Sequence, residues 1–417
     1  MPRRRRNGPA VGLFGRLGAG NIGNDATMEV VLAGIRARQP SVVIDCMCSG
    51  PEEITRKHGL PAQHLHAFHT QPRGRRGPAR TIARIAAGAV VDAWRTAAWV
   101  RRHDAVIVPG MGTLEATLQE RPWQMPWSLF LLGVSGRLFG VDVAFLCVGA
   151  SHIPEPANRW LMVTGARLAH YRSFRDSRSR DELAAMGVPC RADAVFPDLV
   201  LSLRRPETPA PDGPLTVAVG VMAFRGSNTE RGRSEAVHAT YVDAMVRAVV
   251  RLLDAGHRVR LVIGDAEDRD TALAIEEQVL ARRAGAAGYL PFAAASSFDE
   301  VLAQLAACDV VVAARYHNLV AALVLHKPTL AIAYGDKHES LLASMGLPGH
   351  TLPIRTLDVE LLESRVVALH RSREQVEGLL RQHHEAVLAE VDRQFDELDS
   401  ALFGQRRTSP SSSRSMP

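Results

Sequence analysis

An arginine and a histidine stand two positions apart in the stretch "RYHNLV", residues 315–320, which follows the apolar run "CDVVVAA". In an extended segment residues i and i+2 point the same way, so Arg315 and His317 are predicted to face one ligand while Tyr316 turns aside. A guanidinium binds carboxylate or phosphate through two nitrogens, and histidine transfers protons near neutral pH. Lys337, in the later "AYGDKH", adds a positive group. The pattern predicts acid-base chemistry on an anionic substrate, although a structural carboxylate and a carbonyl would satisfy the same two side chains.

A glycine-rich turn, "GAGNIGND", follows the first apolar run and spans residues 18–25. Gly20 and Gly23 allow close approach of the backbone, and Asn24 or Asp25 is predicted to cap the helix that begins at "ATMEVVL". Free N–H groups at such a helix start suit an anion. The spacing departs from the dinucleotide fingerprint, even though Asp45 stands where that fingerprint has its acidic residue. A structural turn and a ligand loop both remain open.

A second polar pair occurs in "HYRSFRDSRSRDELAAMG". Arg175 and Asp176 are predicted at a strand end, with Ser177 as the N-cap of a helix that closes at Gly187. A local Arg–Asp pair that fixes this turn is the simplest interpretation. Farther on, Asn318 is predicted to cap the apolar helix after "RYH".

The elements that must position these residues alternate along both halves of the chain. Short apolar runs, separated by longer amphipathic segments, are "AVGLFG", "SVVIDCM", "DAVIVPG", "DVAFLCVG", "HYRSF", "LTVAVGV", "RVRLVIG", "CDVVVAA" and "TLAIAYG". Near-continuous apolar strands between helices indicate parallel sheets covered on both faces. Polar turns after such strands all lie at the carboxyl edge, where ligands bind. We therefore predict an α/β protein with two doubly wound Rossmann-like domains facing across a cleft.

Composition divides the chain into five parts. The "RRPETPAPDGP" stretch lacks periodicity and is predicted to be a linker, and the C-terminal end has the make-up of a disordered tail. The predicted parts are a basic disordered tail (1–9), an N-terminal Rossmann-like domain (10–203), the linker (204–214), a C-terminal Rossmann-like domain with terminal helices (215–403) and a second disordered tail (404–417).

Composition and charge narrow the class of protein. Of the 417 residues 46% are hydrophobic and 23% charged, which is typical of a soluble globular protein, and five scattered cysteines fit a reducing compartment. The longest apolar region carries Arg137 and Asp142, each costing about 2.5 to 3.5 kcal/mol at a bilayer centre, so it is predicted to be a buried helix and strand. The net charge is +6, but the sequence contains no nucleic-acid-binding motif, so binding to nucleic acid is not expected. We expect a cytoplasmic protein without a metal site.

The ordered set of motifs resembles the polysaccharide pyruvyl transferase family. That family has an N-terminal G-N-x-G-D turn, a mid-chain R-D before a serine-led helix, an R-x-H element and a later Y-x-x-K, and this chain has "GNIGND", "RSFRDS", "ARYHN" and "YGDK" in the same order. Asn24 stands where the family has aspartate, with Asp25 directly after it, and "CVGASHIP" is an unusual central segment. The resemblance implies a GT-B-like fold.

The resemblance also implies a reaction. The enolpyruvyl unit of phosphoenolpyruvate would be moved onto two hydroxyls of a sugar in a cell-surface or exopolysaccharide precursor, giving a pyruvate ketal and phosphate without metal or organic cofactor. Arg315 would bind the donor, His317 would be the acid or base with His152 as a second candidate, and Arg225 would stabilise the departing phosphate. The expected substrate-binding residues are Gly20, Asn21, Gly23, Asn24, Asp25, Arg225, Asn318 and Lys337.

Two rival functions remain open. A nucleotide-sugar-dependent glycosyltransferase of GT-B type would use the same architecture and hold a ribose with a carboxylate, for which "GDAED" offers Asp265 and Glu267. A non-catalytic carbohydrate-associated scaffold would keep the fold alone. The expected partners are phosphoenolpyruvate and a glycan or lipid-linked saccharide acceptor, and no nucleic acid. The basic tails are expected to bring the protein to the inner face of the plasma membrane.

Overall fold

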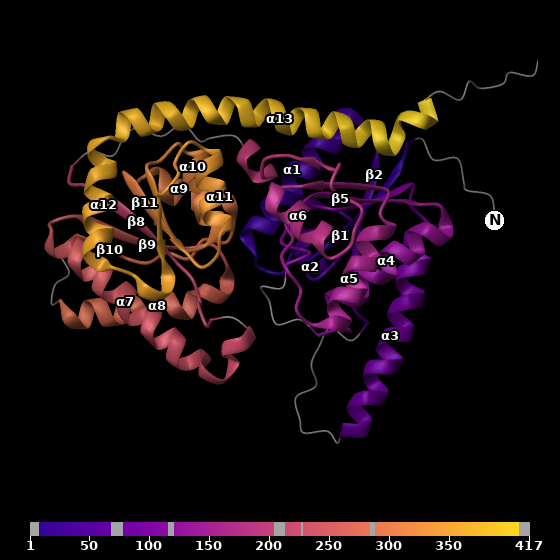
Figure 1. The fold of residues 1–417 in the computed structure, drawn as a ribbon, viewed down its shortest axis with the longest axis horizontal. Coiled ribbons are helices and arrows are strands. Elements are labelled where there is room, and N and C mark those ends of the chain that lie inside the picture. Colours follow the sequence, from indigo (N-terminus) through magenta and orange to yellow (C-terminus); the bar gives the residue numbers. More distant parts are fainter. Residues whose placement is uncertain are drawn as a thin grey trace, which may run out of the picture. The chain divides into compact units, whose positions relative to one another are not determined.

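The computed structural model describes residues 8–67, 78–115, 121–203, 213–226, 228–283 and 288–407. The chain forms two compact units (Figure 1). Unit 1 contains Met1–Ala19, Thr27–Leu199 and Glu390–Pro417, and unit 2 contains Gly20–Ala26 and Val200–Ala389. Most of the turn after the first strand, from Gly20 onward, is thus part of unit 2.

Unit 1 is built on a parallel sheet with the order β3-β2-β1-β4-β5-β6-β7. Its strands are β1 (Ala10–Gly15), β2 (Val43–Cys48), β3 (Ala62–His64), β4 (Ala105–Val108), β5 (Asp142–Val148), β6 (Tyr171–Phe174) and β7 (Ala194–Val195). Its helices are α1 (Ile22–Arg38, whose first turn is grouped with unit 2), α2 (Pro51–His58), α3 (Pro78–Val100), α4 (Met125–Phe139), α5 (Pro156–Leu168) and α6 (Ser177–Ala185). The strands β1 and β4 are buried along their whole length, as expected for a sheet covered on both faces.

Unit 2 repeats this plan with the parallel order β10-β9-β8-β11-β12-β13. Its strands are β8 (Thr216–Val221), β9 (Arg258–Ile263), β10 (Tyr289–Leu290), β11 (Val310–Ala313), β12 (Thr329–Ala333) and β13 (Thr351–Pro353). Its helices are α7 (Ser234–Asp254), α8 (Arg269–Arg282), α9 (Phe298–Ala306), α10 (Tyr316–Val324), α11 (Lys337–Ser344), α12 (Val359–Arg371) and the part of α13 (Arg373–Arg407) up to Ala389. This strand order is that of dinucleotide-binding Rossmann folds, in which ligands bind where the order reverses, here between β8 and β11.

Side-chain capping explains where several helices begin. Ser297 accepts a bond from the Glu300 N–H and so caps α9, and the Glu300 carboxylate accepts from the N–H of Ser296, the residue before the cap. Asp176 caps α6 and Asp358 caps α12. The predicted N-cap of α6, Ser177, was therefore wrong by one residue, because the carboxylate before it reaches the Ser179 N–H at 2.6 Å.

The expected fold class is confirmed, since both units are doubly wound parallel α/β sheets. All nine predicted strands form, and the long apolar region is the helix α4 followed by the buried strand β5. The helix was expected to be buried, but its Leu138 is 71% exposed. The sequence analysis missed β3, β7, β10 and β13, which are edge strands of two or three residues without an apolar run. Most of the predicted linker, residues 204–212, and of the basic tail, residues 1–7, lies outside the described residues.

The C-terminal helix differs from the expected assignment in extent. The helix α13 continues to Arg407, and residues 408–417 of the predicted tail lie outside the described part of the chain. From Glu390 onward α13 is grouped with unit 1, because Arg38 bonds Asp392 and Asp396 and the buried Gln394 donates to Ser173.

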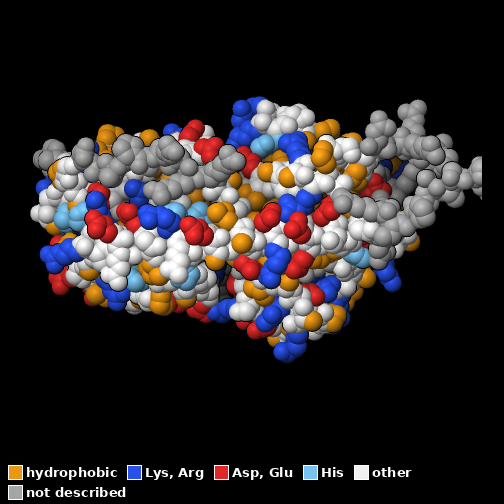
Figure 2. Space-filling view, turned by 90° about the horizontal axis from the view of Figure 1, so that it is seen from above, with side chains coloured by type: hydrophobic (Ala, Val, Ile, Leu, Met, Phe, Trp, Pro, Cys, Tyr) orange, Lys and Arg blue, Asp and Glu red, His pale blue; other side chains and the backbone are white. Residues whose placement is uncertain are grey.

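The charged surface is mixed in sign. On the face drawn in Figure 2, basic and acidic side chains alternate instead of forming one basic field. Within the described ranges, no helix combines the length and the apolar character that crossing a bilayer requires.

Candidate functional site

The residues singled out around "RYHN" lie at the carboxyl end of β11, beside the point where the strand order of unit 2 reverses. The helix α10 starts directly after this strand, with Arg315 at the N-cap position and His317 inside the first turn. The prediction of an extended segment is wrong here. Because the chain turns into a helix at Tyr316, Arg315 and His317 point to different neighbours.

Arg315 is held by two carboxylates from the turn after β9. Its Nε and Nη2 atoms donate to the two oxygens of Asp268 at 2.7 and 2.6 Å, and Nη2 also reaches Glu267 at 2.6 Å. The Asp268 side chain is fully buried, whereas that of Glu267 is 59% exposed. Burial by itself would lower the pKa of Arg315, but the hydrogen bonds and charge of Asp268, then Glu267, raise it overall, so the guanidinium stays protonated.

His317 packs on the glycine-rich turn that belongs to the same unit. A Cβ atom at Gly23 would lie only 1.9 Å from the His317 Cγ, so no larger residue fits under the imidazole. The neighbouring Asn21 donates to Asp265 at 2.8 Å, and its side-chain oxygen accepts from the Asn24 N–H at 3.0 Å. Asn21 is therefore the residue that caps α1, and the predicted caps Asn24 and Asp25 lie inside the first turn.

Asp265 is the carboxyl group of this site with the most perturbed titration. Its two oxygens accept from Asn21 and from the Glu267 N–H. Burial raises its pKa to about 6, which the Arg315 charge and the Glu267 N–H only partly oppose. A carboxyl group that titrates near 6 at the carboxyl end of a parallel strand is suited to proton transfer.

Asn318 lies beneath the site and does not cap α10. Its side chain is fully buried between two glycines at strand ends, since a Cβ at Gly220 would meet its Nδ2 at 2.8 Å and one at Gly264 its Oδ1 at 2.6 Å. No bond to either amide atom is formed among the described residues. The Asn318 amide therefore fills the space between α10 and the ends of β8 and β9, where the strand order of the sheet reverses.

Lys337 joins the same site through aromatic rings. Its Nζ lies 5.0 Å from the ring centre of Tyr334 and 5.6 Å from that of Tyr316, within the range of cation–π attraction. The Tyr316 ring meets His317 edge-on at 5.7 Å. Behind them the buried His338 contacts the carbonyl oxygens of Gly335 and Ala314, tying α11 to the end of β11.

Two of the predicted site residues lie elsewhere. Arg225 follows the end of β8 by four residues, and its guanidinium, half-exposed, bonds Glu235 on α7 at 2.5 Å. His152 is exposed in the loop between β5 and α5 of unit 1. The described contacts therefore join Gly20, Asn21, Gly23, Arg315, His317 and Lys337 in unit 2, but not these two residues.

Unit 1 has its own arginine cluster, at the carboxyl end of strand β6. Arg175 follows β6 and bonds Glu115, with Asp198 4.0 Å away, and all three side chains are 10% exposed or less. A Cβ at Gly149 would meet both Glu115 and Arg175 within 2.7 Å, which explains the glycine there. The expected local pair with Asp176 is secondary, at 3.6 Å, because Asp176 caps α6.

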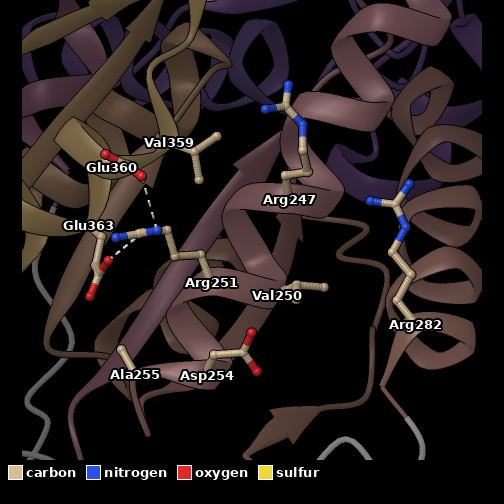
Figure 3. Close-up of a pocket in the computed structure, with 9 residues that line it drawn as sticks. All are labelled: Arg247, Val250, Arg251, Asp254, Ala255, Arg282, Val359, Glu360 and Glu363. Atoms are coloured by element: carbon tan, nitrogen blue, oxygen red, sulfur yellow. Dashed lines mark hydrogen bonds and ion pairs between the residues drawn. The ribbon is translucent and has the colours of Figure 1, made fainter.

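A pocket of about 540 Å³ lies on another side of unit 2 (Figure 3). It is formed where α7 and α8 end and α12 begins, which places it away from the carboxyl ends of the strands. Its lining residues are Arg247, Val250, Arg251, Asp254, Ala255, Arg282, Val359, Glu360 and Glu363. Arg251 bonds Glu363 at 2.5 Å, and Arg247 and Arg282 both bond Asp243, so carboxylates already balance the three arginines.

Two acidic residues that organise these sites were not predicted from the sequence. Asp268, the main partner of Arg315, and Glu115, the main partner of Arg175, each lie far from their arginines in sequence. A usable signal was present for Asp268, because "GDAED" follows the predicted strand that comes before that of "RYHN" along the chain, and both turns lie at the carboxyl edge of one parallel sheet. Asp45, considered for a ribose, instead accepts bonds from Trp99 and His103 inside unit 1.

The two sheets and the site at the reversal point define a class of protein, the two-domain α/β enzymes of GT-B architecture. Solved structures similar to this chain share that fold. A glycosyltransferase from Rickettsia africae is 11% identical with a TM-score of 0.58, and 95% of this chain and 99% of that chain are covered. MurG from Acinetobacter baumannii is 12% identical, with a TM-score of 0.51 and coverage of 94% and 99%. UDP-GlcNAc 2-epimerase from Neisseria meningitidis, bound to UDP-GlcNAc, is 8% identical, with a TM-score of 0.54 and coverage of 95% and 98%.

Sequence comparison resolves the family within this class. The family described as polysaccharide pyruvyl transferase matches residues 21–336, which include residues 21–25 of the glycine-rich turn, Arg175, Arg315 and His317. The chain therefore belongs to the polysaccharide pyruvyl transferase family, and the resemblance seen in its motifs is confirmed. None of the curated proteins matches the sequence.

Proposed function

We propose that this protein transfers the enolpyruvyl unit of phosphoenolpyruvate to two hydroxyls of a saccharide, forming a pyruvate ketal and releasing phosphate. The observation that carries the proposal is the joining of two family motifs in one unit, where Gly23 of the turn lies under the His317 ring. The same turn holds Asp265 through Asn21, which puts two groups able to carry protons around one short segment.

The proton balance of the reaction requires two such groups. Two hydroxyls form bonds to the central carbon of the donor and lose two protons. One proton goes to the methylene carbon, which becomes a methyl group, and the other leaves with the phosphate as its carbon–oxygen bond breaks. His317 is proposed to supply the proton to carbon, and Asp265, ionised above its pKa of about 6, to accept a hydroxyl proton.

Donor binding is proposed to exploit the unequal partners of Arg315. Asp268 is fully buried and fixes the guanidinium, whereas Glu267 is 59% exposed, and an exposed ion pair contributes only about 0 to 1 kcal/mol. A carboxylate or phosphate of the donor would therefore take the place of Glu267 at little cost. Lys337, held over Tyr316 beside His317, is proposed to attract the second anionic group.

The other expected ligands keep supporting roles in this proposal. The first turn of α1, which includes Asn24 and Asp25, lies near His317, and Asn318 supports the strand ends below. Arg225 could stabilise the phosphate only after leaving Glu235, an exposed pair. His152 is proposed to act on the acceptor side. No metal or organic cofactor is required by the reaction.

The test is incubation with isotopically labelled phosphoenolpyruvate and candidate glycans, including lipid-linked ones, followed by mass measurement of the product and an assay of phosphate. A ketal product whose yield falls in a folded His317→Asn variant is expected. Label that stays in the donor across all acceptors, or an undiminished yield in the variant, contradicts the proposal.

The nucleotide-sugar glycosyltransferase is the second candidate, favoured by one observation. Glu267 presents an exposed carboxylate beside Arg315, a position from which it could bind ribose hydroxyls. Thermal protection by a nucleoside diphosphate, without protection by phosphoenolpyruvate, would support this candidate over the first.

A further inference from the structure

The helix α3 exposes an apolar face in unit 1. Ile82, Val90 and Trp94 recur at helical spacing and are 66%, 71% and 73% exposed. The small residues between them, Ala83, Ala86 and Ala87, are exposed as well, and from residue 81 to residue 100 the charged residues are Arg84, Asp92 and Arg95. A surface helix in water normally turns charged residues outward, so this face calls for a covering partner.

Tryptophans extend this face over the neighbouring helices. All five tryptophans of the chain fall between residues 94 and 160. Trp127 donates to the Ala89 carbonyl of α3, its ring stacks on Phe130 at 5.3 Å, and Phe130 lies 5.3 Å from Trp160, which is 60% exposed. We name Ile82, Val90, Trp94, Trp127, Phe130 and Trp160 the tryptophan face. Figure 1 shows α3, α4 and α5, the three helices that carry it, along one side of unit 1.

The charges on the same helices are mostly positive, and one of the arginines, Arg95, lies 3.5 Å from the acidic Asp92. The sequences of α3, α4 and α5 contain six arginines, which are Arg80, Arg84, Arg95, Arg137, Arg159 and Arg167. Their single acidic residue, Asp92, is buried and accepts a bond from the Ala67 N–H at 2.6 Å. The tryptophan face is therefore apolar and accompanied by positive charge.

We propose that the tryptophan face docks unit 1 on an anionic bilayer surface. Tryptophan favours the boundary between headgroups and acyl chains, and each basic residue near anionic lipid adds about 1 kcal/mol. A second copy of the chain fits less well, because self-association would bring arginines against arginines. This inference does not depend on the reaction proposed above.

Vesicle flotation of the full chain tests the docking. Phosphatidylcholine vesicles containing phosphatidylglycerol are expected to bind the protein, and phosphatidylcholine alone to bind it less. The combined variant Ile82→Ser, Val90→Ser, Trp94→Ser should bind the anionic vesicles with an affinity reduced about tenfold or more. A control of the same number of apolar-to-serine changes is Leu273→Ser, Leu280→Ser, Leu388→Ser, which removes three exposed leucines (42%, 46% and 43%) from unit 2 and should bind normally.

Fluorescence and size measurements decide between the remaining outcomes. Tryptophan emission should shift to the blue on binding anionic vesicles, and less in the triple serine variant, whose melting temperature should match the wild type because the changed side chains are exposed. Equal binding by that variant overturns the proposal. The proposal is also overturned if deleting residues 1–7 abolishes vesicle binding while the triple serine variant binds like the wild type. That result would assign the membrane contact to the basic tail. A third contrary outcome is a wild-type protein that is dimeric and does not bind vesicles, together with a triple serine variant that is monomeric.

Discussion

Each unit places an arginine after a strand of its sheet and surrounds it with carboxylates, but the two clusters differ in exposure. Arg175 of unit 1 and its partners Glu115 and Asp198 are 6%, 6% and 10% exposed. Arg315 of unit 2 is 16% exposed and shares its charge between one buried and one exposed carboxylate. An arginine whose partners are all buried cannot exchange them without leaving a charge desolvated.

The difference separates a structural cluster from one suited to chemistry. In unit 1, the Arg175–Glu115 ion pair packs so tightly against Gly149 that there is no room for a Cβ at this position. In unit 2, the glycine at position 23 accommodates His317, a side chain able to transfer protons, and the exposed Glu267 can leave Arg315. Two similar motifs therefore predict different consequences of mutation, loss of stability in one and loss of activity in the other.

The largest effect is expected for His317→Asn. Asparagine retains some hydrogen bonding but cannot transfer a proton, so turnover should fall about a hundred- to ten-thousand-fold while the melting temperature stays near the wild type. Turnover, donor binding and thermal melting are measured together. His152→Asn serves as the comparison from unit 1, and a larger loss there than in His317→Asn would refute the assignment.

Arg175→Met should show the opposite behaviour. Removing the guanidinium leaves Glu115 and Asp198 buried without their cation, so the free energy of unfolding should fall by about 3 to 5 kcal/mol. Urea denaturation measures it. Arg225→Met, which breaks the exposed pair with Glu235, is the matched control and should cost less than about 1 kcal/mol. Similar losses in both variants would remove the distinction between the clusters.

Arg315→Lys keeps the charge but loses the planar fork that bonds Asp268 and that is proposed to bind the donor. Affinity for phosphoenolpyruvate should weaken about tenfold, equivalent to about 1.4 kcal/mol, although net charge is unchanged. Isothermal titration with the donor checks this. Unchanged affinity in the lysine variant would show that the donor does not contact the guanidinium.

Asp265 should give unit 2 a pH dependence of its own. Since its pKa is raised from 3.8 to about 6, the folded protein holds an additional proton between these values, so its contribution to stability falls as pH rises through that window. Activity should rise through pH about 6 as the carboxylate forms. Asp265→Asn should remove both slopes, as followed by pH-dependent melting and rate profiles. If activity of the Asp265→Asn variant still rises through pH about 6, another group is responsible for that rise.

The smallest effect is expected for Glu267→Gln. Loss of the exposed competitor should tighten donor binding a few-fold and change stability by less than about 0.5 kcal/mol. Glu235→Gln, the corresponding change beside Arg225, is the control and should leave donor binding as it is. Weaker donor binding after Glu267→Gln would instead favour a role of this carboxylate in binding ribose hydroxyls.

Local patterns were enough to predict much of this molecule. The apolar runs of β1, β8 and β11 identified two parallel sheets, because strands buried on both faces must be apolar nearly throughout. The order of the glycine-rich turn, "RD", "RYH" and "YGDK" indicated the family without any knowledge of contacts. The short edge strands were not predictable in this way, since two or three residues at a sheet edge need no apolar pattern.

Only the tertiary structure decided what each polar side chain meets. The sequence placed Arg315 and His317 on one side of an extended segment, but the start of α10 at Tyr316 sends one to Asp268 and the other to Gly23. These partners lie 47 and 294 positions away in the sequence. Long-range pairing follows from sheet order and helix packing, and the energy of a buried charge depends on those distant partners, so composition and spacing cannot determine it.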